Sequence, residues 1–184
     1  MKKANPITVL IITAAAVLAG TVIFYFLFHV AGGPVFQALY ITFLTTLYHL
    51  IMRLAVGECV SVLCRGHCFD YDAPWFRPKK WEAGLYRRLG VKRWKKTVLT
   101  AKPEQFDPKV RTPEELAFYM TQAEIVHEII MVLSWVPVLL IGPFGAPAVF
   151  IITSALACLA DGAFVAIQRY NRPRILKILR RREK

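Results

Sequence analysis

Residues 7–30 read ITVLIITAAAVLAGTVIFYFLFHV, and this stretch decides the class of fold. It contains no Asp, Glu, Lys or Arg. A helix rises about 1.5 Å per residue, so a helix of this length spans the roughly 30 Å hydrocarbon core of a bilayer. The stretch therefore predicts a transmembrane helix.

The same stretch has a second interpretation as a secretory signal peptide, because Lys2 and Lys3 precede it. Its apolar run exceeds the roughly 7–15 residues of a signal-peptide core, and no clean cleavage site ends it. An uncleaved membrane anchor is the favoured interpretation.

Three further apolar stretches cover residues 34–57, 119–142 and 146–168. Glycine and proline at residues 32–34 and 142–143 mark turns that group the four stretches into two pairs. A chain of 184 residues is most simply one domain. We therefore expect an all-α membrane protein with four transmembrane helices in two hairpins.

Lysine and arginine residues predict the orientation. Of the 24, two precede the first helix, thirteen lie in residues 65–118 and eight lie in residues 169–184, whereas the connections 31–33 and 142–145 carry none. By the positive-inside rule, both termini, the middle segment and the basic tail 169–184 face the cytoplasm. The expected location is a bacterial-type cell membrane, which the chain crosses several times.

The middle segment, residues 65–118, interleaves aromatic and basic residues, as in PWFRPKKWEAGLYRRLGVKRWKK at positions 74–96. Trp81, Leu85 and Leu89 recur at i, i+4 and i+8, which is typical of an amphipathic helix, and Gly90 suits its C-terminal cap. We expect a helix at the membrane surface, bound to anionic lipid headgroups. Two alternatives are a platform that also grips a phosphorylated substrate and, less favoured, a nucleic-acid interface.

Residues 112–115 read TPEE, which is the pattern of a helix start. Thr112 suits the N-cap, Pro113 suits the first helical position, and Glu115 completes a capping box. The sequence after Pro113 has no breaker until Pro137. The third transmembrane helix is therefore expected to begin in the cytoplasm.

Three polar residues share one face of this expected helix, because Glu124, His127 and Glu128 stand at i, i+3 and i+4. A charge near the bilayer centre costs roughly 2.5–3.5 kcal/mol on insertion scales, so it needs a partner or a function. We expect His127 to be a general base that Glu124 or Glu128 orients. The alternative is a structural network of buried ion pairs.

Other ionisable residues lie in the second and fourth predicted helices. His49 and Arg53 are one turn apart, and Asp161 lies about two turns before the cytoplasmic end of the fourth helix. On the predicted topology Arg53 and Asp161 reach the depth of His127. We expect these residues to contribute to substrate binding or, in the structural alternative, to pair with one another.

The fourth helix leaves the hydrocarbon at QRYNRPR, residues 168–174. Pro173 disfavours helical conformation at the preceding residue, so the guanidinium groups of Arg172 and Arg174 are expected to point back along the membrane surface. Bidentate guanidinium groups suit a phosphate or carboxylate. Candidate substrate-binding residues are therefore Gln168, Tyr170, Asn171, Arg172 and Arg174; headgroup anchoring is the alternative.

The residues Cys59, Cys64, His67 and Cys68 form the one cluster of metal-ligating types. The paired CxxC spacings of a zinc ribbon are missing, so we expect no metal and no bound cofactor. In a reducing compartment these thiols are expected to stay reduced.

Three ordered motifs resemble one known family. They are WxxxxYxxLxVxxWKxxxL from Trp81 to Leu99, AExxH at residues 123–127, and QRYNRPR at residues 168–174. The chain resembles the glycosyl-4,4'-diaponeurosporenoate acyltransferase family, small membrane enzymes of carotenoid glycolipid synthesis, over roughly residues 75–180.

The resemblance implies transfer of a fatty acyl group to a hydroxyl of a membrane-bound glycolipid or lipid alcohol. His127, with Glu124 or Glu128, would take the hydroxyl proton, and Asn171 and Arg172 would donate to the developing oxyanion. Arg174 and the basic middle segment would hold the phosphates of an acyl-CoA or acyl-carrier donor. The alternatives are another lipid-modifying chemistry at the same arginines, such as phosphoryl transfer or reduction, and a non-catalytic scaffold or lipid-binding subunit of a larger complex.

Overall fold

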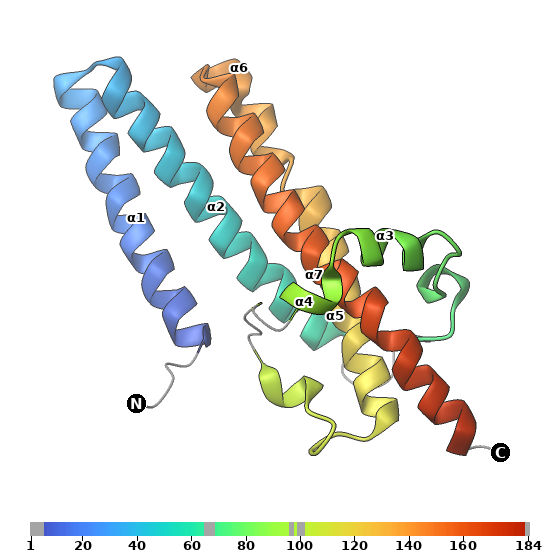
Figure 1. The fold of residues 1–184 in the computed structure, drawn as a ribbon. Helices are drawn as coiled ribbons and strands as arrows, with labels where there is room; N and C mark the ends of the chain where they lie inside the picture. Colours follow the sequence, from blue (N-terminus) through green and yellow to red (C-terminus); the bar gives the residue numbers. More distant parts are fainter. Residues whose placement is uncertain (1–5, 65–68, 96–97, 99–101, 183–184) are drawn as a thin grey trace. The chain divides into compact units, whose positions relative to one another are not determined.

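The structure is a computed structural model that describes residues 6–64, 69–95, 98 and 102–182. In these residues every regular element is a helix, and four helices are long and apolar enough to cross a membrane (Figure 1). The all-α prediction is confirmed at this level, while the two-hairpin arrangement and the cytoplasmic orientation stay predictions. The chain forms two compact units: the first is Met1–Gly57 with Ile129–Ala160, and the second is Glu58–Glu128 with Asp161–Lys184.

The first unit contains α1 (Pro6–Ala31) and most of α2 (Pro34–Leu63), which match the predicted spans 7–30 and 34–57. The two glycines between these helices have positive φ, a conformation that glycine adopts without a Cβ clash. The rings of Phe24 and Phe43 pack at 5.1 Å between centroids. A Cβ on Gly20 would lie 2.3 Å from the Phe43 ring, so glycine at this position permits the close approach.

The first unit also contains the end of α5 (Pro113–Leu133), η3 (Val136–Leu140), α6 (Ile141–Phe144) and the start of α7 (Pro147–Arg182). The predicted turn residues Gly142 and Pro143 lie inside α6, so the turn signal is displaced. The residues with positive φ are Gly145, at the end of the predicted connection 142–145, and Ala146. A proline in the first turn of a helix sacrifices no hydrogen bond, so Pro143 does not prevent α6.

The apolar side chains of these helices are largely uncovered by protein. Ile12 is 63% exposed, Leu139 78% and Leu159 71%. Apolar area of this kind costs about 25 cal/mol per Å² in water but nothing against acyl chains. This exposed apolar surface therefore suits contact with the acyl chains of lipids.

The second unit packs α3 (Glu82–Arg88), α4 (Val91–Trp94) and the short helices η1 (Pro74–Phe76) and η2 (Pro103–Phe106) around parts of α5 and α7. Ala117 of α5 packs with Leu176 and Leu179 of α7 in a buried apolar cluster. Gly90, with φ of 64°, separates α3 from α4, as its predicted capping role requires.

The predicted capping box is confirmed. The backbone N–H of Glu115 donates to Oγ1 of Thr112 at 3.2 Å, and the N–H of Thr112 donates to Oε2 of Glu115 at 2.9 Å. Two of the donors left without partners at the start of α5 are thereby satisfied.

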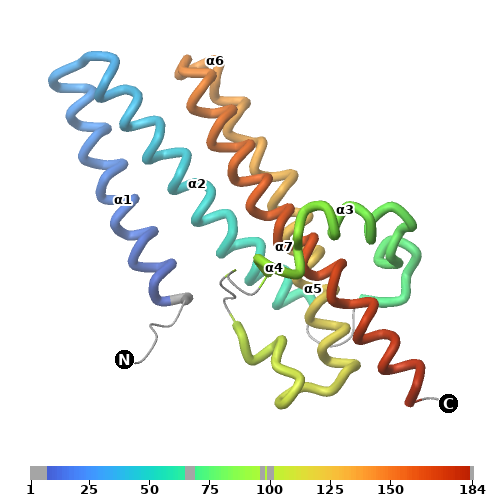
Figure 2. The backbone as a smooth tube through the Cα atoms, in the orientation of Figure 1, coloured from blue at the N-terminus to red at the C-terminus, as the bar shows by residue number. Residues whose placement is uncertain are grey.

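The predicted break at Pro173 is wrong. Residues up to Arg182 belong to α7, and Figure 2 shows the red C-terminal part of this helix as a continuous helical tube. An interior proline costs about 3 kcal/mol. Buried contacts on both sides, from Arg172 before it and from Leu176 and Leu179 after it, offset this cost and keep the helix intact.

We predict that Thr112→Ala lowers the free energy of unfolding by about 1 kcal/mol, because it removes the N-cap acceptor of α5. Thermal unfolding of the purified protein in detergent measures the change. Thr112→Ser keeps a hydroxyl and serves as the control, so equal loss in both variants would contradict the capping role.

Candidate active site

The second unit brings His127 of α5 and Asp161 of α7 together. The Nδ1 atom of His127 lies 2.8 Å from Oδ1 of Asp161. Asp161 is 1% exposed and the imidazole 20% exposed. The carboxylate therefore holds Nδ1 in its protonated form and leaves Nε2 as the basic nitrogen.

Phe164 fixes the plane of the imidazole. The two rings stack with centroids 4.4 Å apart and 6° between their planes. With one nitrogen bonded and one face covered, the ring has a single orientation. An oriented histidine beside a buried carboxylate has the geometry that a general base requires.

Glu124 does not orient His127, and this corrects the first of the two predicted partners. Its carboxylate is 0% exposed and accepts hydrogen bonds from two arginines of α7: Nη1 of Arg169 at 2.6 Å and Nη1 of Arg172. The charges and hydrogen bonds of two guanidinium groups offset the free-energy cost of desolvating one buried carboxylate. Glu124 therefore joins α5 to α7.

Glu128 does not orient His127 either. Its two carboxylate oxygens accept from Nε1 of Trp75, at 3.0 and 3.3 Å. Asp161 takes the place predicted for Glu124 or Glu128. The antiparallel course of α5 and α7 brings it beside His127.

Arg169 also binds α3. Its Nη2 and Nε atoms lie 2.6 and 3.1 Å from Oε1 of Glu82, which is buried. The hydroxyl of Tyr86 donates to the other oxygen of Glu82 at 3.3 Å. Burial, followed by the charge of Glu82, raises the pKa of Tyr86 to about 12, so this hydroxyl stays a donor at physiological pH.

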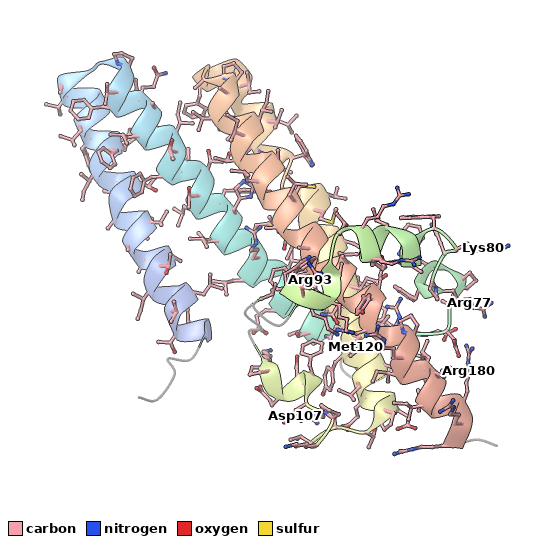
Figure 3. All side chains as sticks on the ribbon, in the orientation of Figure 1. Arg77, Lys80, Arg93, Asp107, Met120 and Arg180 are labelled. Atoms are coloured by element: carbon pink, nitrogen blue, oxygen red, sulfur yellow. The ribbon has the colours of Figure 1, made fainter. Side chains whose placement is uncertain are left out.

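We call residues 72–78 the strap. Its backbone carbonyls bind the same two arginines: those of Trp75 and Arg77 accept from Arg169 at 3.2 and 3.4 Å, and that of Phe76 accepts from Arg172. Figure 3 shows the side chains on the ribbon, with Arg77 labelled. The strap is thereby bound to α7 beside Glu124.

The predicted residues at the end of α7 divide into two groups. Arg172 is 1% exposed and faces Glu124, and Gln168 is also buried. Asn171 accepts from Nζ of Lys95 at 2.6 Å, while the guanidinium of Arg174 lies 4.1 Å from the centroid of the Tyr170 ring. Arg172 therefore does not point along the membrane surface, because it lies inside an intact helix and is held by a buried carboxylate.

His49 and Arg53 lie in the first unit. His49 is buried, and Arg53 donates to the carbonyls of His49 at 3.1 Å and of Ala157 at 3.4 Å. The carbonyl contacts show how a guanidinium is accommodated among apolar helices. Their predicted part in substrate binding stays a prediction.

The cysteine cluster is only partly described. Cys59 is exposed and Cys64 is buried, whereas His67 and Cys68 lie outside the described residues. Within the described residues no group of three or more His, Cys, Asp or Glu side chains has the arrangement of a metal site.

Sequence reasoning missed four residues of this site: Trp75, Glu82, Phe164 and Arg169. Trp75 and Glu82 belong to the basic, aromatic middle segment, Arg169 belongs to the basic tail 169–184, and Phe164 is one of many apolar residues in a membrane span. One signal was available for Glu82. Glu82 and Tyr86 stand at i and i+4, so both fall on one face of the helix, about 100° round from Trp81 and Leu85.

The comparisons with known proteins give one match. The family described as glycosyl-4,4'-diaponeurosporenoate acyltransferase matches residues 72–181, which is more than half of the chain. The matched region contains the strap, His127, Asp161, and Glu124 with the two arginines that bind it. No match was found among curated proteins or among solved structures.

We predict that Glu124→Gln destabilises the protein by about 3–5 kcal/mol, because it removes the acid that pairs with the buried Arg172 and one of the two acids that pair with Arg169. The measurement is the midpoint of thermal unfolding in detergent, together with the yield of monodisperse protein. Glu128→Gln is the matched control, since the amide oxygen still accepts from the Trp75 indole. A loss of stability in Glu128→Gln as large as in Glu124→Gln would argue against the cluster.

Proposed function

Because this chain belongs to the glycosyl-4,4'-diaponeurosporenoate acyltransferase family, we propose that it moves a fatty acyl group from an activated donor to a hydroxyl of a glycolipid or lipid alcohol. The observation that carries the mechanism is the 2.8 Å contact between His127 and Asp161. Four helices of membrane length suit substrates that are themselves lipids. The family description names a glycosylated carotenoid acid as acceptor, and we extend to this chain the class of acceptor, a membrane-bound lipid with a hydroxyl.

In the proposed reaction the acceptor oxygen attacks the carbonyl carbon of an acyl thioester. Nε2 of His127 takes the hydroxyl proton as the C–O bond forms, while Asp161 stabilises the imidazolium through Nδ1. The C–S bond then breaks, and the departing sulfur takes the proton back from Nε2. The products are an ester and a thiol, and the histidine returns to its starting state.

Asn171 and Arg172 are not suitable oxyanion donors, which revises the assignment made from the resemblance. Asn171 is ten residues beyond Asp161 on α7, or about 15 Å along the helix axis. Arg172 is committed to Glu124 and to the Phe76 carbonyl. We assign Arg172 and Glu124 a positioning role: they set the register in which His127 meets Asp161.

The donor is proposed to be acyl-CoA or an acyl-carrier thioester that approaches from the cytoplasm, and no bound cofactor is needed. Arg174, exposed on α7 and packed on Tyr170, was predicted to hold donor phosphates. The proposed orientation, with both termini and residues 65–118 in the cytoplasm of a bacterial-type cell, puts the basic residues on the donor side.

We also propose that α3 lies on the membrane surface. Leu85 of this helix is 39% exposed, and its capping residues Trp81 and Leu89 are 60% and 54% exposed, whereas Glu82 and Tyr86 are buried. Because the acidic Glu82 is buried and the apolar stripe is exposed, this segment suits contact with acyl chains. The neighbouring Arg87 and Arg88 would bind anionic headgroups.

A scaffold or lipid-binding subunit is the second candidate. The observation that favours it is a network of buried ion pairs with two charges of each sign, made by Glu82, Glu124, Arg169 and Arg172. A scaffold would not need an oriented histidine with one available nitrogen. The pair of His127 and Asp161, which we call the dyad, therefore favours catalysis.

We predict that His127→Ala lowers acyl transfer by a factor of roughly 10² to 10⁴, because the general base is lost. Asp161→Asn should also lower kcat, since an amide no longer holds the required tautomer. The measurement is mass spectrometry of lipids from a host that expresses each variant at equal membrane levels. The wild type should add one fatty acyl mass to an acceptor lipid.

His29→Ala is the control, because His29 lies at the end of α1 in the first unit. If His127→Ala protein folds normally and transfers acyl groups at the wild-type rate, the mechanism is wrong. If the wild type acylates no lipid in a host that contains candidate acceptors, the scaffold function takes its place.

A further inference from the structure

The second unit has a basic groove between the strap and the C-terminal turns of α7. Its volume is about 450 Å³. The charged residues that line it are Arg77, Lys177, Arg180, Arg181 and Asp72. Figure 3 labels Arg77 and Arg180, which lie on the same side of this unit. A volume of this size falls within the range of roughly 300–1,000 Å³ typical of small-molecule sites.

The groove keeps a positive excess after its internal contacts are counted. Asp72 is the one acid among the lining residues, and its carboxylate accepts from Nη2 of Arg180 at 2.8 Å. Arg77 donates through Nε to the backbone carbonyl of Asp72 at 2.9 Å, which neutralises no charge. The four lining cations therefore exceed the one lining acid by three. Of these cations, Lys177 and Arg181 are exposed to an incoming ligand.

The strap connects this groove to the catalytic histidine. Asp72, Arg77 and Pro78 line the groove, while the Trp75 indole binds Glu128, the residue next to His127. Along α7, Lys177 is sixteen residues beyond Asp161, or about 24 Å along the axis. An extended pantetheine arm places its thioester and its phosphates at the two ends of a span of this order.

We infer that the basic groove binds the phosphates at the nucleotide end of an acyl-coenzyme A donor, and that the pantetheine arm follows the strap to His127. The inference rests on the proposed acyl transfer, for which it specifies the donor. Coenzyme A carries three phosphates on one small molecule, and several cations around one groove match that density of charge better than a single lipid phosphate does.

The first test is direct binding of free coenzyme A, measured by calorimetry on the full chain in nanodiscs of uncharged phosphatidylcholine. Lys177→Ala and Arg181→Ala should each weaken binding about tenfold, the effect of one lost charge-assisted contact. Removal of the 3′-phosphate from the ligand should also weaken binding, and pantetheine alone should not bind measurably. Arg182→Ala is the matched control, because Arg182 is an exposed neighbour on α7 that does not line the groove.

Any one of three binding results would overturn the inference. The first is that the wild type does not bind coenzyme A, and the second is that Arg174→Ala weakens binding while the two groove variants do not. The third is that the groove variants change only the binding to phosphatidylglycerol vesicles, which would make the groove a headgroup site. Transfer from an acyl-carrier protein but not from acyl-coenzyme A would overturn it as well. Coenzyme A binding with the expected losses but without acyl transfer would support the groove and reject the proposed function.

Discussion

The carboxylate of Glu124, enclosed by the guanidinium groups of Arg169 and Arg172, is the contact on which the second unit depends. A buried carboxylate costs several kcal/mol of desolvation unless opposite charges and hydrogen bonds compensate it. Only one register of α5 against α7 gives Glu124 both arginines. In that register His127, one turn further along α5, meets Asp161, which lies earlier on the antiparallel α7. The contacts of Glu124 and the contact between His127 and Asp161 therefore occur in the same register of the two helices.

The same two arginines also bind the backbone of the proline-containing strap. The strap has little regular hydrogen bonding of its own, and buried carbonyls need donors. Arg169 and Arg172 supply them to three successive residues, Trp75, Phe76 and Arg77. Glu82 then balances the remaining charge and fixes α3. Groove, strap and dyad are consequently parts of one arrangement in the second unit.

Lipid explains features that would be unfavourable in water. The long helices expose apolar side chains. The helix α3 buries a glutamate, while a tryptophan and two leucines in this helix and at its caps are exposed. A membrane-surface location reconciles both observations, because the apolar stripe then contacts acyl chains and the buried charges avoid them. The proposed reaction matches this composition, because it draws a lipid acceptor from the bilayer and a charged donor from the aqueous side.

The sequence by itself determined the helical class, the four membrane-length spans and the capping box at Thr112, because length, hydropathy and local hydrogen bonding depend on near neighbours in the chain. It also singled out His127 and suggested the acyltransferase family. Only the tertiary structure decided which acid orients His127, that Glu124 binds arginines, and that α7 continues through Pro173. Those outcomes depend on contacts between residues such as Glu124 and Arg172, 48 positions apart. The energy of a buried charge depends on which partner reaches it, and no local pattern contains that information.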